Sequence, residues 1–412
     1  MYSFSGKIKL VAIISMVVGL LGIGYSFIAT PSTVEALGAH ASHDPAHAEH
    51  VLHLLQNKPW AALYVAALFF MLISLGVLAF YAINRAAQAG WAPILFRVME
   101  GITGYLPIGA LIFFFLLVFS GLHFNHLFIW MDPAVVAHDK VIQGKTGYLN
   151  VPFFLVRAAV YMLGWIAYRQ ITRKLSKAQD QAHDNRPFVK AFKWSAGFLV
   201  FFLVSESMMS WDWVMSVDPH WFSTLFGWYV FGSLIASAIA AIILVTVTLK
   251  SQGYLEHVND SHLHDLAKYL FGFSIFWTYL WFSQYLLYWY SNIPEEVTYF
   301  VTRLEHYEPI VLSMLAINFL LPLLILVDSD IKRKPWVVGT MAVVILVGHY
   351  LDFFNMIMPA TVGDQWCIGA GEIGSVLFFF GLFTFVTFRT LTKAPLVEKN
   401  HPLMYESEHF HY

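Results

Sequence analysis

A small set of ionisable side chains stands inside long apolar runs of this 412-residue sequence. An intramembrane charge costs at least about 2.5–3.5 kcal/mol, so such groups are expected to be paired or to have a function. Histidines and carboxylates in this setting suit proton transfer, and they also suit hydrogen bonding to a quinol, whose oxidation releases protons. The candidates are His123, His126, Arg157, Glu206, Asp212, His349 and Asp352, with Glu100 as a candidate for proton entry.

Spacing sorts most of these candidates into pairs. His123 and His126 are three residues apart, which predicts one helical face, with His123 about 10 Å inside the end of its span. His349 and Asp352 have the same spacing, so the carboxylate could fix the tautomer of the histidine and favour its protonation. A buried histidine merely satisfied by its neighbour explains that second pair equally well.

Arg157 requires a carboxylate partner, and Asp212 or Glu206 on the following span is the nearest candidate. These two acids are six residues apart and therefore point about 120° away from each other. An ion pair of this kind could fix the register of two helices and do no chemistry. The alternative is a protonatable cluster.

The composition indicates that most of this chain lies in lipid and not in water. Hydrophobic residues make up 58% of it and charged residues 12%, against about a quarter in soluble domains, and the mean hydropathy is +0.63. A net charge of −2 offers no attraction to nucleic acid. Cys367 is the one cysteine, which excludes a disulfide framework, a thiolate zinc site and an iron–sulfur cluster held by this chain alone.

Ten stretches are long and apolar enough to cross a bilayer as helices. The sequence therefore predicts an all-α integral membrane protein with a single polytopic domain over residues 1–412. Strands are excluded because open sheet edges do not occur in lipid. The predicted spans are 8–29, 60–83, 98–129, 150–169, 193–216, 221–249, 267–290, 308–327, 336–358 and 371–390.

Basic residues predict the orientation of these spans. Nineteen of the 24 lysines and arginines fall at the termini or in the loops on the side that the termini share. The opposite side has Lys58, Lys140, Lys145 and Arg303, and Arg157 lies within a span. Because positive residues stay in the cytoplasm, both termini are predicted to be cytoplasmic.

The longest loop on the opposite side is rich in histidine over residues 40–53. A metal site is one interpretation, but no carboxylate or cysteine completes a specific ligand set, so a solvated amphipathic stretch is favoured and no metal is predicted. Haem is also disfavoured, because too few histidines lie well inside the spans. The five loop histidines are His40, His43, His47, His50 and His53.

Three strings carry a family resemblance: residues 16–25 (MVVGLLGIGY), 210–224 (SWDWVMSVDPHWFST) and 284–296 (QYLLYWYSNIPEE). They resemble the membrane subunits of bacterial alternative complex III, a quinol:cytochrome c oxidoreductase. Those subunits in turn look like the NrfD/polysulfide-reductase membrane-anchor family. The resemblance extends over essentially the whole chain and is greatest to the shorter of the two ten-helix subunits.

The resemblance implies two four-helix bundles, formed by spans 2–5 and 6–9, with spans 1 and 10 beside them in the bacterial plasma membrane. It implies that the redox centres lie in partners: a larger homologous membrane subunit, an iron–sulfur protein, multihaem and monohaem cytochrome c subunits, and in some bacteria a terminal oxidase. No metal or covalent cofactor is expected in this chain, with menaquinol the candidate bound molecule beside lipids.

Three hypotheses follow. A subunit with its own quinone site predicts an apolar cavity at the outer ends of spans 2–5, with His123 or Asp212 at its head. A structural or proton-transferring subunit without quinone predicts a polar path through Glu206 toward Glu100. An independent secondary transporter predicts broken helices facing a midplane site.

Overall fold

The chain is almost entirely helical. The computed structural model describes residues 2–36 and 45–411, and this part of the chain has no strand. The α-helices are α1 (Gly6–Ala29), α2 (Pro45–Ala86), α3 (Phe96–Ile102), α4 (Leu106–Gly121), α5 (Pro133–His138), α6 (Lys140–Gln143), α7 (Val151–Gln179), α8 (Arg186–Trp213), α9 (Phe226–Ser251), α10 (Asp260–Ser291), α11 (Pro294–His306), α12 (Glu308–Leu315), α13 (Leu321–Ile325), α14 (Pro335–Val362), α15 (Ala370–Leu391) and α16 (Met404–Glu408).

Within the described residues, nine helical segments are long and apolar enough to cross a membrane. Each of them contains or overlaps a predicted span. They are Gly6–Ala29, His47–Ala86, Pro93–Gly121, Val151–Gln179, Arg186–Val217, Phe226–Ser251, Glu308–Ile325, Pro335–Val362 and Ala370–Leu391. The remaining predicted span, 267–290, lies within the 32-residue helix α10, whose apolar character is diluted by Tyr, Trp, Ser and Gln.

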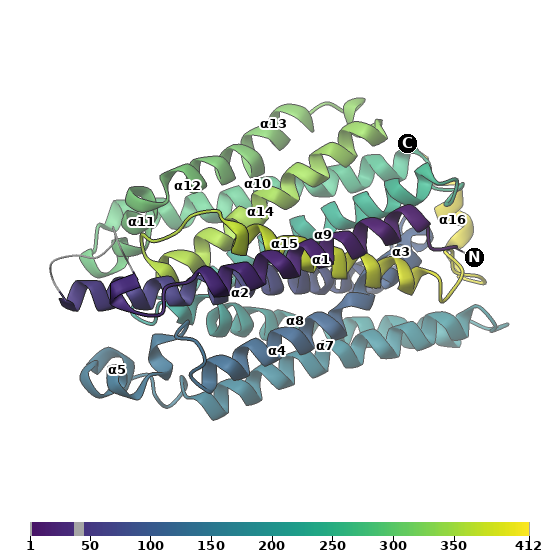
Figure 1. The fold of residues 1–412 in the computed structure, drawn as a ribbon. Helices are drawn as coiled ribbons and strands as arrows, with labels where there is room; N and C mark the ends of the chain where they lie inside the picture. Colours follow the sequence, from purple (N-terminus) through teal and green to yellow (C-terminus); the bar gives the residue numbers. More distant parts are fainter. Residues whose placement is uncertain (1, 37–44, 412) are drawn as a thin grey trace.

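The long helices run side by side, and α1 begins at the same end of the molecule at which α15 ends (Figure 1). We call this the terminal end and the opposite end, which carries α5 and α11, the distal end. Helix α2 occupies the centre and packs against α4, α8, α9, α14 and α15. Around it, α7 packs on α4 and α8, whereas α10 and α14 pack on α9, and α12 packs on α14.

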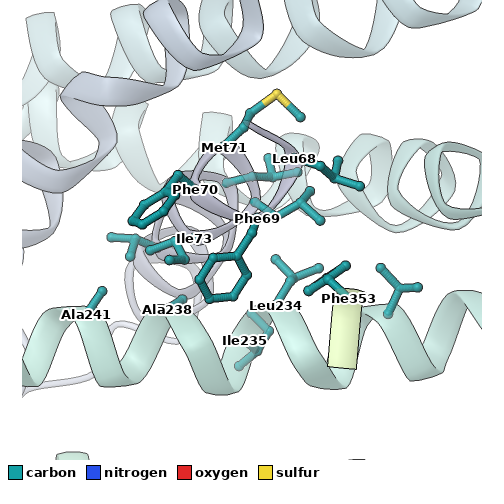
Figure 2. Close-up of a cluster of buried hydrophobic side chains, with 14 of the residues drawn as sticks. Leu68, Phe69, Phe70, Met71, Ile73, Leu234, Ile235, Ala238, Ala241 and Phe353 are labelled. Atoms are coloured by element: carbon teal, nitrogen blue, oxygen red, sulfur yellow. The ribbon is translucent and has the colours of Figure 1, made fainter. Parts of the chain in front are cut away.

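The contact between α2 and α9 is formed by buried aliphatic and aromatic side chains. Figure 2 shows Phe69 and Ile73 of α2 directed to α9, where Leu234 and Ala238 lie. Gly76 lets the two backbones approach, because a Cβ atom there would lie 2.6 Å from the carbonyl oxygen of Leu234. Small residues at such contacts are typical of helices that associate within a membrane.

Helices α1 and α15 form a pair at the side of this core. Their backbones meet at glycines on both helices: a Cβ atom on Gly19 would lie 2.4 Å from the backbone nitrogen of Phe378, and one on Gly381 would lie 2.5 Å from the carbonyl oxygen of Ala12. No side chain fits in this interface, so glycine is required for the pairing.

Candidate functional site

Of the two carboxylates predicted as partners of Arg157, the structure pairs it with Asp212. Arg157 lies in the second turn of α7, whose start is fixed by Asn150, the side chain of which accepts a hydrogen bond from the Phe153 amide at 3.0 Å. The Arg157 guanidinium donates to both carboxylate oxygens of Asp212, from Nε at 2.8 Å and from Nη2 at 2.9 Å. Tyr161 adds a third donor to Asp212 at 3.2 Å. This two-point geometry is the strongest arrangement for such a pair.

The remaining faces of Arg157 are also occupied. Its Nη1 donates to the carbonyl oxygen of Tyr148 at 2.9 Å, and the guanidinium carbon lies 3.8 Å from the Tyr148 ring centre and 4.4 Å from that of Phe153. Because Asp212 is 0% exposed, the pair is sealed from solvent and lipid. A closed, fully hydrogen-bonded pair fixes α7 against α8.

Glu206 does not share this arrangement. It lies on α8 six residues before Asp212, about 9 Å along the helix axis. The side chain is buried, and its Oε1 atom has no hydrogen-bond partner among the described residues. No ion pair among the described residues would therefore compensate a charge on this carboxyl, because Arg157 is paired with Asp212.

A second buried carboxylate, Asp352 on α14, is satisfied by neutral donors. The Tyr229 and Ser233 hydroxyls of α9 and the Trp277 indole of α10 all donate to it, the last at 2.8 Å. His349 lies beside this carboxylate as predicted, with Nδ1 3.7 Å from an Asp352 oxygen, a distance that allows an ion pair when the imidazole is protonated. Neither ring nitrogen of His349 has a hydrogen-bond partner in the described structure.

Asn318 is a further buried and unsatisfied polar side chain, which the sequence did not indicate. Its side-chain oxygen would lie 2.1 Å from a Cβ atom placed on Gly348, next to His349, and neither polar atom of the amide has a partner among the residues described. Asn318 lies in a π-helical turn, Ala316–Leu320. Pro322 explains the turn, since it has no amide hydrogen to donate to the Asn318 carbonyl. A single asparagine in an apolar run gives no signal in the sequence.

The two remaining histidine candidates do not lie inside a span. The predicted span 98–129 is wrong at its end, because α4 stops at Gly121 and His123 adopts a left-handed conformation with φ of 59°. Both His123 and His126 are exposed and cannot share a helical face. The backbone of His126 is instead bonded through its amide and its carbonyl to the side chain of Asn57, at 3.0 and 3.2 Å.

The histidine-rich segment meets this loop at one point. The rings of His53 and His126 pack edge to face with their centres 5.9 Å apart. His40 and His43 lie outside the described residues. Within the described ranges there is no group of three or more His, Cys, Asp or Glu side chains that could hold a metal ion.

Glu100 lies at the terminal end, inside a buried cluster of charges. Arg97 is 3.5 Å from Glu100, Tyr81 donates to it at 3.0 Å, and Arg173 forms a close ion pair with it. Arg97 also pairs with Asp180 at 2.6 Å. The prediction that inner-side arginines are simple loop charges is therefore wrong for Arg97, which is only 1% exposed.

The C-terminal segment inserts a further carboxylate, Glu398, into this arginine cluster. Glu398 pairs with Arg85 and accepts a hydrogen bond from Ser176 at 2.6 Å. Burial raises the pKa of Glu398, and Arg85 opposes that shift. Burial, together with the positive charge of Arg85, lowers the pKa of the neighbouring His401 to about 3. Nothing in the local sequence indicates this insertion, because Glu398 is 313 residues from Arg85.

An open cavity of about 400 Å³ lies at the distal end, between the segment that precedes α7 and the end of α8 with the segment that follows it, in the region where a quinone site is predicted. Its wall includes Lys145, Tyr148, Trp211, Ser216 and Trp221. Neither predicted head residue contributes to that wall: Asp212 is sealed behind Arg157, and His123 lies on the exposed loop.

No protein-family model matches this chain, and no curated protein matches it.

Proposed function

We propose that this chain is a multi-pass membrane subunit of a bacterial quinol:cytochrome c oxidoreductase of the alternative complex III type. In this role it transfers protons beside the quinol-linked electron transport of its partners. The family resemblance supplies the type of complex. The partners are a larger homologous membrane subunit, an iron–sulfur protein and multihaem and monohaem cytochrome c subunits in the bacterial plasma membrane.

The proposed topology has cytoplasmic termini and ten spans, which are the nine apolar segments together with α10. The packing supports two four-helix bundles: α2, α3–α4, α7 and α8 form one, and α9, α10, α12–α13 and α14 form the other. The position of the arginine cluster at the terminal end agrees with a cytoplasmic assignment of that end.

The two proposed bundles also correspond in the positions of their buried carboxylates, which supports the division of the chain into two similar halves. Asp212 and Asp352 lie on the last helix of each proposed bundle, each seven residues before a proline, Pro219 and Pro359. A tyrosine hydroxyl from the first helix of the bundle reaches each site: Tyr64 donates to the carbonyl of Trp213 at 2.7 Å, and Tyr229 donates to Asp352.

The proton-transfer role is supported mainly by Glu206, which is buried without a hydrogen-bond partner for Oε1 among the described residues. A purely structural carboxyl would be expected to have a partner like that of Asp212, since an unmade hydrogen bond in a buried place costs about 1–3 kcal/mol. Glu206 is retained in the interior of α8 with Oε1 unpartnered among the described residues. A carboxyl of this kind suits a group that binds and releases a proton through transient water.

Two measurements test the proposal. When a tagged chain is purified from its native membrane, c-type haem is expected to co-purify and to be visible in the reduced-minus-oxidised spectrum. The preparation is also expected to have quinol:cytochrome c reductase activity. In vesicles containing that complex, Glu206→Gln is expected to lower proton release per electron, whereas Glu305→Gln, at an exposed position, leaves it unchanged. Purification without haem would contradict the partner assignment, and unaltered proton release in Glu206→Gln would contradict the role of Glu206.

A further inference from the structure

A second cavity lies at the distal end, between α9, α10 and α11, in the half that holds Asp352. Its volume is about 300 Å³, at the lower end of the range for small-molecule sites, about 300–1,000 Å³. The wall is formed by the segment that leads into α9, by the last turns of α10 and by the first turn of α11. The lining residues used below are Phe222, Ser223, Gln284, Leu287, Tyr288 and Glu296.

Gln284 is the polar group that marks this cavity as a binding site. It is 2% exposed and contributes to the wall, and its Nε2 has no hydrogen-bond acceptor within 3.5 Å among the described residues, although the Tyr288 hydroxyl lies beside it. A buried amide donor without an acceptor is unfavourable, and native proteins contain few of them. A ligand oxygen in the cavity would satisfy it.

The other polar groups of the wall define the ligand further. Glu296 contributes a carboxylate, Ser223 a hydroxyl and Tyr288 a phenol that donates to the Phe222 carbonyl at 3.1 Å. Among the described residues no lysine or arginine lines the cavity, and the Lys145 ammonium lies 6.0 Å from the Phe222 ring in the neighbouring cavity, so a phosphate or carboxylate ligand would meet the Glu296 charge without a cation in the wall. The ligand is therefore uncharged, with an acceptor for Gln284 and a donor for Glu296.

The apolar part of the wall suits an aromatic ring with a hydrocarbon tail. Phe222 and the Tyr288 ring contribute aromatic surface, and Leu287 is 65% exposed on the outside of α10, where a tail would leave toward lipid. Gln284 lies seven residues after Trp277, the donor to Asp352, so both project from one face of α10 about 10 Å apart along the axis. The cavity is thus two helical turns from a buried carboxylate.

We propose that this cavity binds the headgroup of a quinol, with one ring oxygen accepting from Gln284 and the opposite hydroxyl donating to Glu296. The choice of a quinol among uncharged ring ligands rests on the proposed function. The site differs from the one predicted at the outer ends of spans 2–5, because it belongs to the other half of the chain.

The test uses the purified full chain in lipid nanodiscs, with the fluorescent quinol analogue 2-heptyl-4-hydroxyquinoline N-oxide as the probe. Binding quenches the probe, and a short-chain quinol is expected to displace it. Gln284→Met, which keeps the side-chain length, and Glu296→Gln are each expected to weaken binding about tenfold. Glu295→Gln is the matched control, because Glu295 is exposed and does not line the cavity.

Other outcomes would contradict either this site or the proposed function. Unchanged binding in Gln284→Met would overturn the proposal, as would displacement of the probe by phosphatidylethanolamine but not by the quinol. Loss of binding only in Lys145→Ala would place the site in the cavity beside α7 and α8. A chain that binds the probe but purifies without cytochrome partners would contradict the proposed function and leave this site standing, whereas a haem-containing complex with no probe binding would contradict only this site.

Discussion

The guanidinium Nε of Arg303 lies 3.0 Å from the carbonyl oxygen of Asn355, the carbonyl that Pro359 leaves without a helical hydrogen bond. Its Nη2 donates to the next carbonyl, that of Met356, at 3.0 Å, and the Tyr299 ring lies 3.3 Å from the guanidinium carbon. The sequence had placed Arg303 among the few distal loop charges, but it is buried and supports the proline-containing part of α14.

Replacement of Arg303 by methionine is therefore expected to lower the free energy of unfolding by about 2–4 kcal/mol, because buried carbonyl groups lose charged donors. Arg303→Lys should recover only part of this loss, since one ammonium cannot reproduce the planar fork. Thermal unfolding followed by tryptophan fluorescence measures both. Arg186→Met, at a side chain that is 87% exposed, is the control, and an equal unfolding temperature in Arg303→Met and Arg186→Met would refute the argument.

The pair Arg157–Asp212 predicts strong coupling between two substitutions. Arg157→Met or Asp212→Leu alone leaves a buried charge unpaired, at a cost of about 3–5 kcal/mol, whereas the double variant should be nearly as stable as the wild type. Unfolding temperatures of the four proteins form the test. Additive losses would show that the two residues do not act as a pair.

Acidification is expected to loosen the C-terminal segment around His401. The pKa of His401 is about 3 in the folded chain, below the ordinary value of about 6.5, so the released segment gains a proton that the docked one cannot hold. Docking is fully stable above pH 6.5 and weakens as the pH falls toward 3, by up to about 1.4 kcal/mol per pH unit. His262, whose imidazole nitrogen bonds the Ser407 carbonyl and whose pKa burial lowers to about 4, acts in the same direction.

Hydrogen exchange of residues 396–411 at pH 7.5 and pH 5.5, corrected for intrinsic rates, measures this effect. Glu398 acts in the opposite direction. Because its pKa is raised in the docked segment, the docked form takes up a proton at a pH at which the released carboxyl is still charged, so acidification through this group favours docking. His401→Gln removes the titration of one histidine and should reduce the pH dependence. An identical pH dependence in wild type and His401→Gln would exclude His401 as a cause.

The glycine contact of α1 with α15 predicts a position-specific effect within one helix. Gly19→Leu should separate the two helices and lower the unfolding temperature by several degrees, since its Cβ would collide with the backbone at Phe378. Gly24→Leu is the matched control, because no atom lies within 4 Å of the position of its Cβ. If both variants unfold alike, the close approach is not what stabilises the pair.

The sequence alone determined the helices and one pairing. In lipid every backbone group must be bonded within the chain, so long apolar runs predict helices whatever their neighbours are. The same cost of an isolated charge predicted that Arg157 would find Asp212 or Glu206, and the structure shows Asp212. Both inferences depend on solvation, which each segment experiences locally.

The tertiary structure decided which polar groups are satisfied and by what. Three donors from α9 and α10 hydrogen-bond Asp352, whereas His349 only lies beside it. A left-handed turn at His123 ended α4 before its two histidines, and the C-terminal segment brought Glu398 to Arg85. Hydrogen bonds form with whichever group the packing brings within about 3 Å, and residues far apart in the chain compete for the same oxygen. Spacing along one helix describes only the nearest competitors, whereas the packing of the other helices determined the rest.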